Sequence, residues 1–165
     1  MSGTARLGLP FLSAGQAQKE FTHNEALQTL DTLVAGAVED GPQQDPPSSP
    51  AIGSCYILGN APTGDWVGKP LFVAAYTSGG WRLTAPVEGM SLYVKSADQW
   101  ANFRSGTWEI GMVRASSLVI GGQQVIGAQA AAIADPAGGS MIDEEARAAV
   151  DLILTAMRQH GLIAI

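Results

Sequence analysis

The chain has 165 residues, of which 46% are hydrophobic and 15% are charged, and its formal net charge is −6. This length suits one ordinary domain with a core of its own, and the charged fraction is well below the roughly 25% of typical soluble domains. An acidic chain has no positive field to attract phosphate groups, which argues against nucleic-acid binding and against docking on anionic membranes.

Residues 1–21 are the first predicted element, an irregular docking segment that Gly8, Pro10 and Gly15 interrupt. Its apolar residues indicate that it packs on another part of the protein. It lacks the unbroken apolar stretch of a signal peptide, and no part of the chain approaches the ~18 apolar residues of a membrane span. We therefore expect a protein that is made in the cytoplasm and is not inserted into a membrane.

An amphipathic helix is predicted over residues 22–40, where Thr22 and Glu25 fit a capping box. Apolar residues then recur at helical spacing and predict one face that must be buried, either against the body or against a neighbouring copy. The packing residues expected on this face are Leu27, Leu30, Val34 and Val38. Four prolines in residues 41–53 predict a linker after the helix.

Residues 54–120 are predicted to form a β-rich body of short strands separated by glycine turns. Tyr76–Trp81 and Phe103–Trp108 look like hairpins of one design, each with an aromatic residue before a Ser-Gly turn and a tryptophan after it. Their likeness predicts a twofold β-meander repeat. The expected strands are 54–58, 70–76, 81–84, 91–95, 99–104 and 107–113.

A Gly/Ala-rich connector over residues 121–139, with room for one short strand, leads to a C-terminal helix in residues 140–165. Ser140 or Asp143 is placed to cap this helix, and Gly161 is placed to end it. Its apolar stripe and the apolar C-terminus predict an interface between identical subunits. The interface residues expected are Ala146, Val150, Ile153, Leu154, Met157, Leu162 and Ile163.

The predicted fold class is therefore α+β: an N-terminal helix, a small antiparallel β-meander body with two similar hairpins, and a C-terminal oligomerisation helix. Chemistry for catalysis is sparse. His23 lies in the predicted capping box, His160 lies at a helix end, and Cys55 lies in an apolar run that suits a small buried side chain. Phosphate-binding, metal-binding and nucleophile motifs are absent. We expect no catalytic residue, no metal site and no cofactor.

The tryptophans of the body support a second hypothesis, because aromatic rings stack on sugars. A carbohydrate-binding module would need at least two coplanar, solvent-facing rings, whereas core packing is the ordinary use of such residues. The candidate glycan platform comprises Trp66, Trp81, Trp100 and Trp108. A third hypothesis, a small capsule hydrolase, would need paired carboxylates in a cleft, and the sequence gives no sign of them.

One combined pattern covers most of residues 5–113. Its parts are Leu7-Gly8-Leu9-Pro10-Phe11, Gln16-Ala17-Gln18-Lys19, Thr22-His23-Asn24-Glu25-Ala26-Leu27, Leu30-Asp31, Ser49-Pro50, Tyr56, Trp66, Gly68-Lys69, Trp81 and Trp108. This pattern resembles a family of unknown function from alphaproteobacterial prophages and gene transfer agents. The ending, from Ala132 to Ile163, looks like the C-terminal helix of tail-fibre and spike subunits of that group.

The resemblance implies a non-catalytic structural protein on the surface of a phage-like particle. The length of the chain suits a head-spike base of a gene transfer agent, or an adaptor that joins the capsid to a longer receptor-binding fibre. The implied partners are identical subunits in a trimer or pentamer, a capsid protein and a fibre protein. The alternative is a carbohydrate-binding module of a spike or tail fibre that contacts cell-surface polysaccharide of the host.

Overall fold

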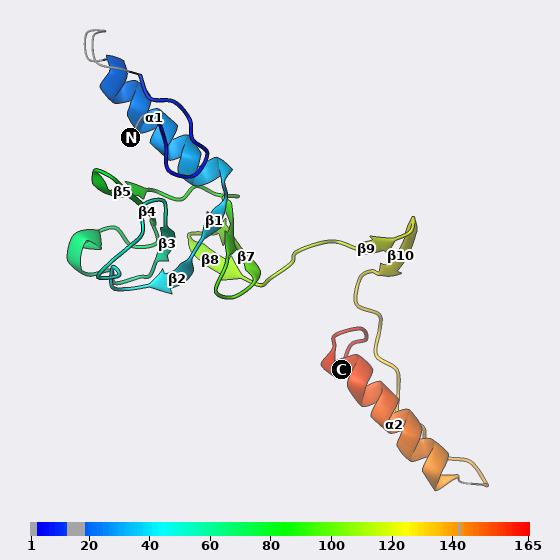
Figure 1. Cartoon of the computed structure of the whole chain (residues 1–165). Helices are drawn as coiled ribbons and strands as arrows, with labels where there is room; N and C mark the ends of the chain where they lie inside the picture. The colour runs from blue at the N-terminus through cyan, green and yellow to red at the C-terminus, as the bar shows by residue number, and fades with distance from the viewer. Residues whose placement is uncertain (1–2, 13–18, 142) are drawn as a thin grey trace. The chain divides into compact units, whose positions relative to one another are not determined.

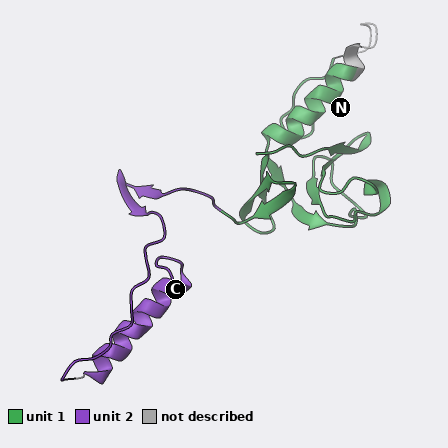
Figure 2. Ribbon diagram, turned by 180° about the vertical axis from the view of Figure 1, so that it is seen from behind, with its two compact units in different colours: residues 1–112 green, residues 113–165 purple. Residues whose placement is uncertain are grey.

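The computed structural model describes residues 3–12, 19–141 and 143–165, and of residues 19–21 only the backbone. The chain forms two compact units, residues 1–112 and residues 113–165 (Figure 2). One helix lies near each end of the chain, and the strands between them are mostly antiparallel and form small sheets. The predicted α+β fold class is confirmed. None of the helices in the described ranges has the length and apolar character needed to cross a membrane.

Helix α1 spans Lys19–Val34, and the N-terminal residues 3–12 run alongside it (Figure 1). The prediction of a helix over 22–40 was wrong at both ends. Thr22 lies inside the helix and does not cap it. The helix ends early because Gly36, with a φ of +39°, turns the chain, and the residues after it pair with a distant strand.

The residues that follow α1 form two short strands, β1 (Ala37–Val38) and β2 (Asp40–Gln43). The predicted linker, residues 41–53, therefore begins too early, because a strand occupies its first three positions. β1 pairs in parallel with β6 (Ser91–Val94), and β2 pairs in parallel with β3 (Cys55–Leu58). Both partners lie far along the chain, so local sequence could not indicate these strands.

The body of unit 1 contains two three-stranded meanders. The first continues from β3 through β4 (Val73–Thr77) and β5 (Gly80–Thr84), and the second from β6 through β7 (Gln99–Arg104) and β8 (Thr107–Ile110). The two predicted hairpins are confirmed, since Tyr76 pairs with Trp81 and Phe103 with Trp108. The ring centroids of these pairs are 4.9 Å and 5.2 Å apart.

The two sheets share one topology, β2-β3-β4-β5 and β1-β6-β7-β8. In each, a short strand from the segment after α1 adds in parallel to the first strand of a meander. Alternate residues of the two sheets form one hydrophobic core, since successive side chains of a strand point to opposite faces. The buried members of this core are Val38, Cys55, Ile57, Val73, Ala75, Leu92, Val94, Ala101 and Trp108.

Unit 2 consists of a β-hairpin, an extended connector and a helix. The hairpin is β9 (Leu118–Ile120) with β10 (Gln123–Ile126), and the helix is α2 (Glu144–Gln159). The predicted body, residues 54–120, thus extends too far, because β9 pairs within unit 2. Asp143 caps α2 as predicted, through a 2.8 Å bond from the Ala146 N–H.

The predicted glycine stop of α2 is also present. Gly161 has a φ of +69°, and its N–H bonds the Arg158 carbonyl at 3.0 Å. The Leu162 N–H bonds the Met157 carbonyl at 2.9 Å. These two bonds form a Schellman motif, which satisfies the last carbonyls of the helix.

Candidate functional site

A buried carboxylate, Asp31, fixes the N-terminal segment on α1. Its residue is 3% exposed. One oxygen accepts hydrogen bonds from the Thr4 hydroxyl at 2.7 Å and the Leu7 N–H at 2.5 Å, and the other accepts from the Arg6 N–H at 3.0 Å. Hydrogen bonds to a charged acceptor are stronger than neutral ones. These three bonds therefore hold residues 4–7 against the helix.

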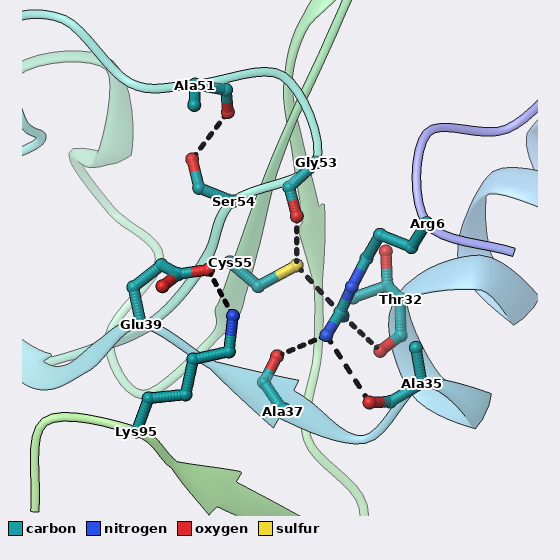
Figure 3. Close-up of polar contacts among 10 residues, drawn as sticks. All are labelled: Arg6, Thr32, Ala35, Ala37, Glu39, Ala51, Gly53, Ser54, Cys55 and Lys95. Atoms are coloured by element: carbon teal, nitrogen blue, oxygen red, sulfur yellow. Dashed lines mark hydrogen bonds and ion pairs between the residues drawn. The ribbon is translucent and has the colours of Figure 1, made fainter.

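The side chain of Arg6 extends from this segment to the C-terminal end of α1 (Figure 3). Its guanidinium donates to the carbonyl oxygens of Thr32 at 3.2 Å, Ala35 at 3.3 Å and Ala37 at 2.7 Å. α1 has no basic residue in its last turn. Arg6 supplies the positive charge that the negative end of a helix favours, and it ties the helix to β1. We call these residues, Thr4, Arg6 and Asp31 with their bonded carbonyls, the Arg6–Asp31 cluster.

Cys55 is a buried free cysteine that lies next to the Arg6–Asp31 cluster, and its contacts are those of a packed structural residue. Its sulfur is 3.3 Å from Arg6 Nη1 and 3.7 Å from the Gly53 carbonyl oxygen (Figure 3). Burial raises the pKa of the Cys55 thiol, and the nearby Arg6 guanidinium offsets only part of that rise. The thiol is therefore protonated at neutral pH, whereas a nucleophilic cysteine needs a depressed pKa.

A polar depression of about 590 Å³ lies next to this cluster, lined in part by Arg6, Glu39, Ser54 and Lys95. Its charges are already paired within the protein. Lys95 Nζ is 2.7 Å from Glu39 Oε1, and Arg6 is held by backbone carbonyls. Within the described ranges, no group of three His, Cys, Asp or Glu side chains is placed to hold a metal ion.

Large apolar side chains are exposed at many positions of unit 2. On α2, Val150, Leu152 and Ile153 are 42%, 72% and 59% exposed. Leu162 and Ile165, after the helix, are exposed as well. Such side chains gain roughly 1.5–3 kcal/mol each when they move from water into an apolar contact. The single chain leaves this gain unused.

The residues predicted to form the subunit interface differ in their exposure in the single chain. Ala146, Val150, Ile153 and Leu162 are exposed, and Met157 is half-buried. The prediction was wrong for Leu154 and Ile163, because both are buried inside unit 2. Ile163 lies beside Ala130 of the connector in a parallel bridge, so the connector, and not a neighbouring copy, covers that side.

Two arginines hold the connector against α2. Arg147 donates to the Gly138 carbonyl, and Arg158 donates to the Ile133 carbonyl at 2.6 Å. Arg158 also forms a 2.8 Å ion pair with Asp135. One side of α2 is therefore occupied within the chain, while the adjoining apolar side remains open.

The β9–β10 hairpin adds to the apolar surface of unit 2. Side chains alternate between the two faces of a strand, yet large apolar residues are exposed at successive positions and hence on both faces. They are Leu118, Val119, Ile120, Val125 and Ile126. An isolated two-stranded hairpin is only marginally stable in water, so further contacts are needed to stabilise this one.

The α1 packing prediction has a different outcome. Val38 is fully buried, but in β1, and Leu27 is half-buried. Leu30 and Val34 are exposed in the single chain, at 49% and 69%, so they do not pack against the body. Their burial against a neighbouring copy stays a prediction. The helix instead directs Asp31 inward, because the Arg6–Asp31 cluster stabilises that face.

The four candidate platform tryptophans do not form a coplanar set. Trp66 and Trp108 are buried, and Trp81 is half-buried. The rings of Trp66 and Trp81 meet edge to face, with an interplanar angle of 77°. Trp100 alone among the four is largely exposed, at 56%. The predicted platform is therefore wrong for at least Trp66 and Trp108.

A comparison of the two similar sheets explains why Trp100 is exposed while Trp66 is buried. The outer face of β3–β5 is covered by the loop between β3 and β4, which places Trp66 against it. The connection between β6 and β7 is only a four-residue turn, so among the described residues the outer face of β6–β8 has no equivalent cover. This open face carries Tyr93 and Trp100, with ring centroids 5.7 Å apart, and the bonded pair Ser91 and Asn102.

Sequence reasoning assigned no role to Arg6 or Asp31, although Asp31 stood within the family-like pattern. A weak signal was present: Asp31 lies one helical turn from both Leu27 and Val34, on a side of the helix that is otherwise apolar. A lone carboxylate in such a place needs buried donors. The identity of those donors, 24 to 27 residues earlier in the chain, could not be deduced from spacing.

Comparison with known proteins gives one match. The family described as "Protein of unknown function (DUF2793)" matches residues 23–109. This range runs from α1 to the last strand of the second meander and excludes unit 2. No curated protein and no solved structure matches the chain.

Proposed function

The chain belongs to the DUF2793 family, and from this starting point we propose that it is a non-catalytic structural subunit that assembles with copies of itself. Its place would be the surface of a phage-like particle, as a head-spike base of a gene transfer agent or an adaptor between the capsid and a longer fibre. The subunit is made in the bacterial cytoplasm and joins the particle there.

The observation that carries this proposal is the open apolar side of unit 2. Two large apolar residues, Leu154 and Ile163, are its buried hydrophobic side chains in the described range, while many more are exposed. Monomeric proteins rarely expose large contiguous apolar patches, and such patches mark interaction sites. Self-association would bury these exposed apolar side chains, and it needs no reactive or ligand-binding group at the surface.

The test is the mass of the full chain in solution at micromolar concentration, measured by light scattering during size-exclusion chromatography. We expect an integral multiple of 17.1 kDa that persists on dilution to low micromolar concentration. A stable monomer of 17.1 kDa would overturn the proposal. The particle assignment has its own test: an antibody against the chain should label the surface of purified particles.

A second candidate function, contact with cell-surface polysaccharide, is supported by the open face of β6–β8. Exposed Trp100 offers a ring for stacking on a sugar, and Tyr93, Ser91 and Asn102 offer polar groups beside it. Tyrosine and tryptophan combine an apolar face with a polar group, which suits such ligands. One exposed indole is a smaller platform than a pair of coplanar rings.

Replacing Trp100 with alanine tests this second candidate. With a purified capsular polysaccharide as the probe, we expect the wild-type chain to bind and the W100A variant to lose about fivefold or more in affinity. The stacking of a nucleic-acid base on an aromatic side chain, taken as a guide to the size of the effect, contributes roughly 1–3 kcal/mol. Val87→Ala, at another exposed apolar residue of unit 1, is the control. Equal affinity of W100A and wild type, or no binding by either, contradicts the candidate.

A further inference from the structure

We propose that α2 is the axis of the assembly: three copies of the helix pack in parallel, with Val150 and Met157 at heptad positions a and Ala146 and Ile153 at positions d. This inference rests on the proposed self-assembly and specifies its geometry. Each copy also contributes its connector, which stays bound to its own helix on the outside of the bundle.

The register follows from spacing and exposure together. Ala146, Val150, Ile153 and Met157 are separated by four, three and four residues, the alternation that keeps one seam facing a partner helix. The first three are exposed in the single chain and Met157 is half-buried. We call these four residues the α2 seam. Because three of the four seam side chains are exposed in the single chain, the seam is available to another copy.

The two flanks of the seam differ in a way that suits a bundle of helices. On the e flank, Leu154 is buried and Arg147 is bonded to the connector. On the g flank, Ala149 and Ala156 are exposed. In a parallel bundle the g flank of one helix faces the e flank of the next. Alanine is small enough for the connector-covered flank of a neighbour to approach closely.

A bundle of three helices, and not of two, is favoured by the residues in and beside the α2 seam. Two-stranded coiled coils prefer a β-branched residue at a and leucine at d, whereas isoleucine at d combined with leucine or isoleucine at a shifts the preference to three or four strands. Neither d position of α2 holds the leucine that a two-stranded coil prefers. Ile153 occupies d here. The exposed alanines at g also widen the apolar stripe beyond the narrow a/d seam of a two-stranded coil.

Parallel alignment follows from closed threefold symmetry, which gives every copy the same direction along the axis. The acidic first turn does not oppose it, because Glu144 and Glu145 fall at positions b and c, outside the seam. A 16-residue helix is close to the length at which isolated helices are marginal in water. The seam and the exposed β9–β10 hairpin together supply the missing burial.

The experiment uses cysteine crosslinking in the full chain. Cys55 is the chain's single cysteine and is buried, so Ala146→Cys introduces one accessible thiol at position d near the start of α2. With a short bis-maleimide reagent we expect rapid crosslinking between copies of A146C, and a solution mass near 51 kDa, three times 17.1 kDa. In an antiparallel pair, position 146 of one helix lies far from position 146 of the other.

The matched control is Ala148→Cys, an exposed alanine in the same turn that lies at position f, away from the axis. We expect at least a tenfold slower crosslinking of A148C. Equal rates for both variants, a dimeric or tetrameric mass, or an oligomer without A146C crosslinking would overturn the proposed bundle while leaving self-assembly intact. A monomeric wild type would overturn both.

Discussion

The Ile153→Glu variant is expected to dissociate the assembly into monomers at micromolar concentration. Ile153 is the large apolar residue in the middle of the α2 seam and is 59% exposed in the single chain. In the proposed bundle, every copy would bring a carboxylate into an apolar axis without a partner, which costs several kcal/mol for each charge. We expect the dissociation constant to rise by on the order of 100-fold or more.

Light scattering checks this expectation, and Thr155→Glu is the control. Thr155 is exposed two residues later, at position f, so a carboxylate there should leave the mass unchanged. Because all four tryptophans lie in unit 1, their fluorescence should stay native in both variants and thereby exclude unfolding of unit 1. The helical signal in far-UV circular dichroism should be the same for both variants if α2 stays folded. An I153E variant with the wild-type mass would contradict the placement of the interface on α2.

Replacement of Asp31 with alanine is expected to destabilise unit 1 by about 3 kcal/mol. The change removes the charged acceptor of three hydrogen bonds. The Thr4 hydroxyl and the backbone N–H groups of Arg6 and Leu7 then lose their hydrogen-bond partner. Hydrogen bonds to charged groups contribute roughly 1.5–3 kcal/mol, and donors left buried add a further cost. Once residues 4–7 are released, Arg6 also loses its fixed position at the end of α1.

Urea unfolding followed by tryptophan fluorescence at constant protein concentration measures this loss. Asp151→Ala, at an exposed position of α2, is the control and should change the free energy of unfolding of unit 1 by less than ~0.5 kcal/mol. If D31A does not fold, Thr4→Val removes one bond to the same carboxylate and the bond that the Thr4 hydroxyl accepts from the Leu9 N–H, and should cost about 2 kcal/mol. Identical midpoints for D31A and D151A would show that the cluster is not needed.

The proposed self-assembly and the proposed α2 bundle both depend on exposed apolar surfaces, and in both the polar clusters of unit 1 have a structural role. The Arg6–Asp31 cluster joins three segments of unit 1: residues 4–7, the end of α1 and the start of β1. Cys55 lies beneath it as a protonated, buried thiol. Rigidity of this kind suits a subunit that must present a fixed surface.

Strand predictions in the body succeeded because their signals are local. The hairpins Tyr76–Trp81 and Phe103–Trp108 pair as expected, since a turn with glycine and an aromatic pair across it specify register within six residues. The ends of α2 were predictable for the same reason: Asp143 and Gly161 act on neighbouring backbone groups.

The end of α1 and its buried face depended instead on contacts between distant residues. Ala37 and Val38 continue a helical apolar pattern, yet they pair with Tyr93 and Val94, more than 50 residues later. Propensity is a weak prior that tertiary pairing overrides. Likewise, Asp31 is turned inward by donors near the N-terminus, which leaves Leu30 on the surface.

The sequence by itself determined the class of fold, the two hairpins and the caps of α2, because short-range backbone geometry and side-chain alternation fix these features. The tertiary structure decided which apolar residues have a partner. It buried Trp66 under its own loop and left Trp100 exposed, and it covered Leu154 but not Ile153. Burial depends on which segment lies over a side chain, and that segment comes from elsewhere in the chain.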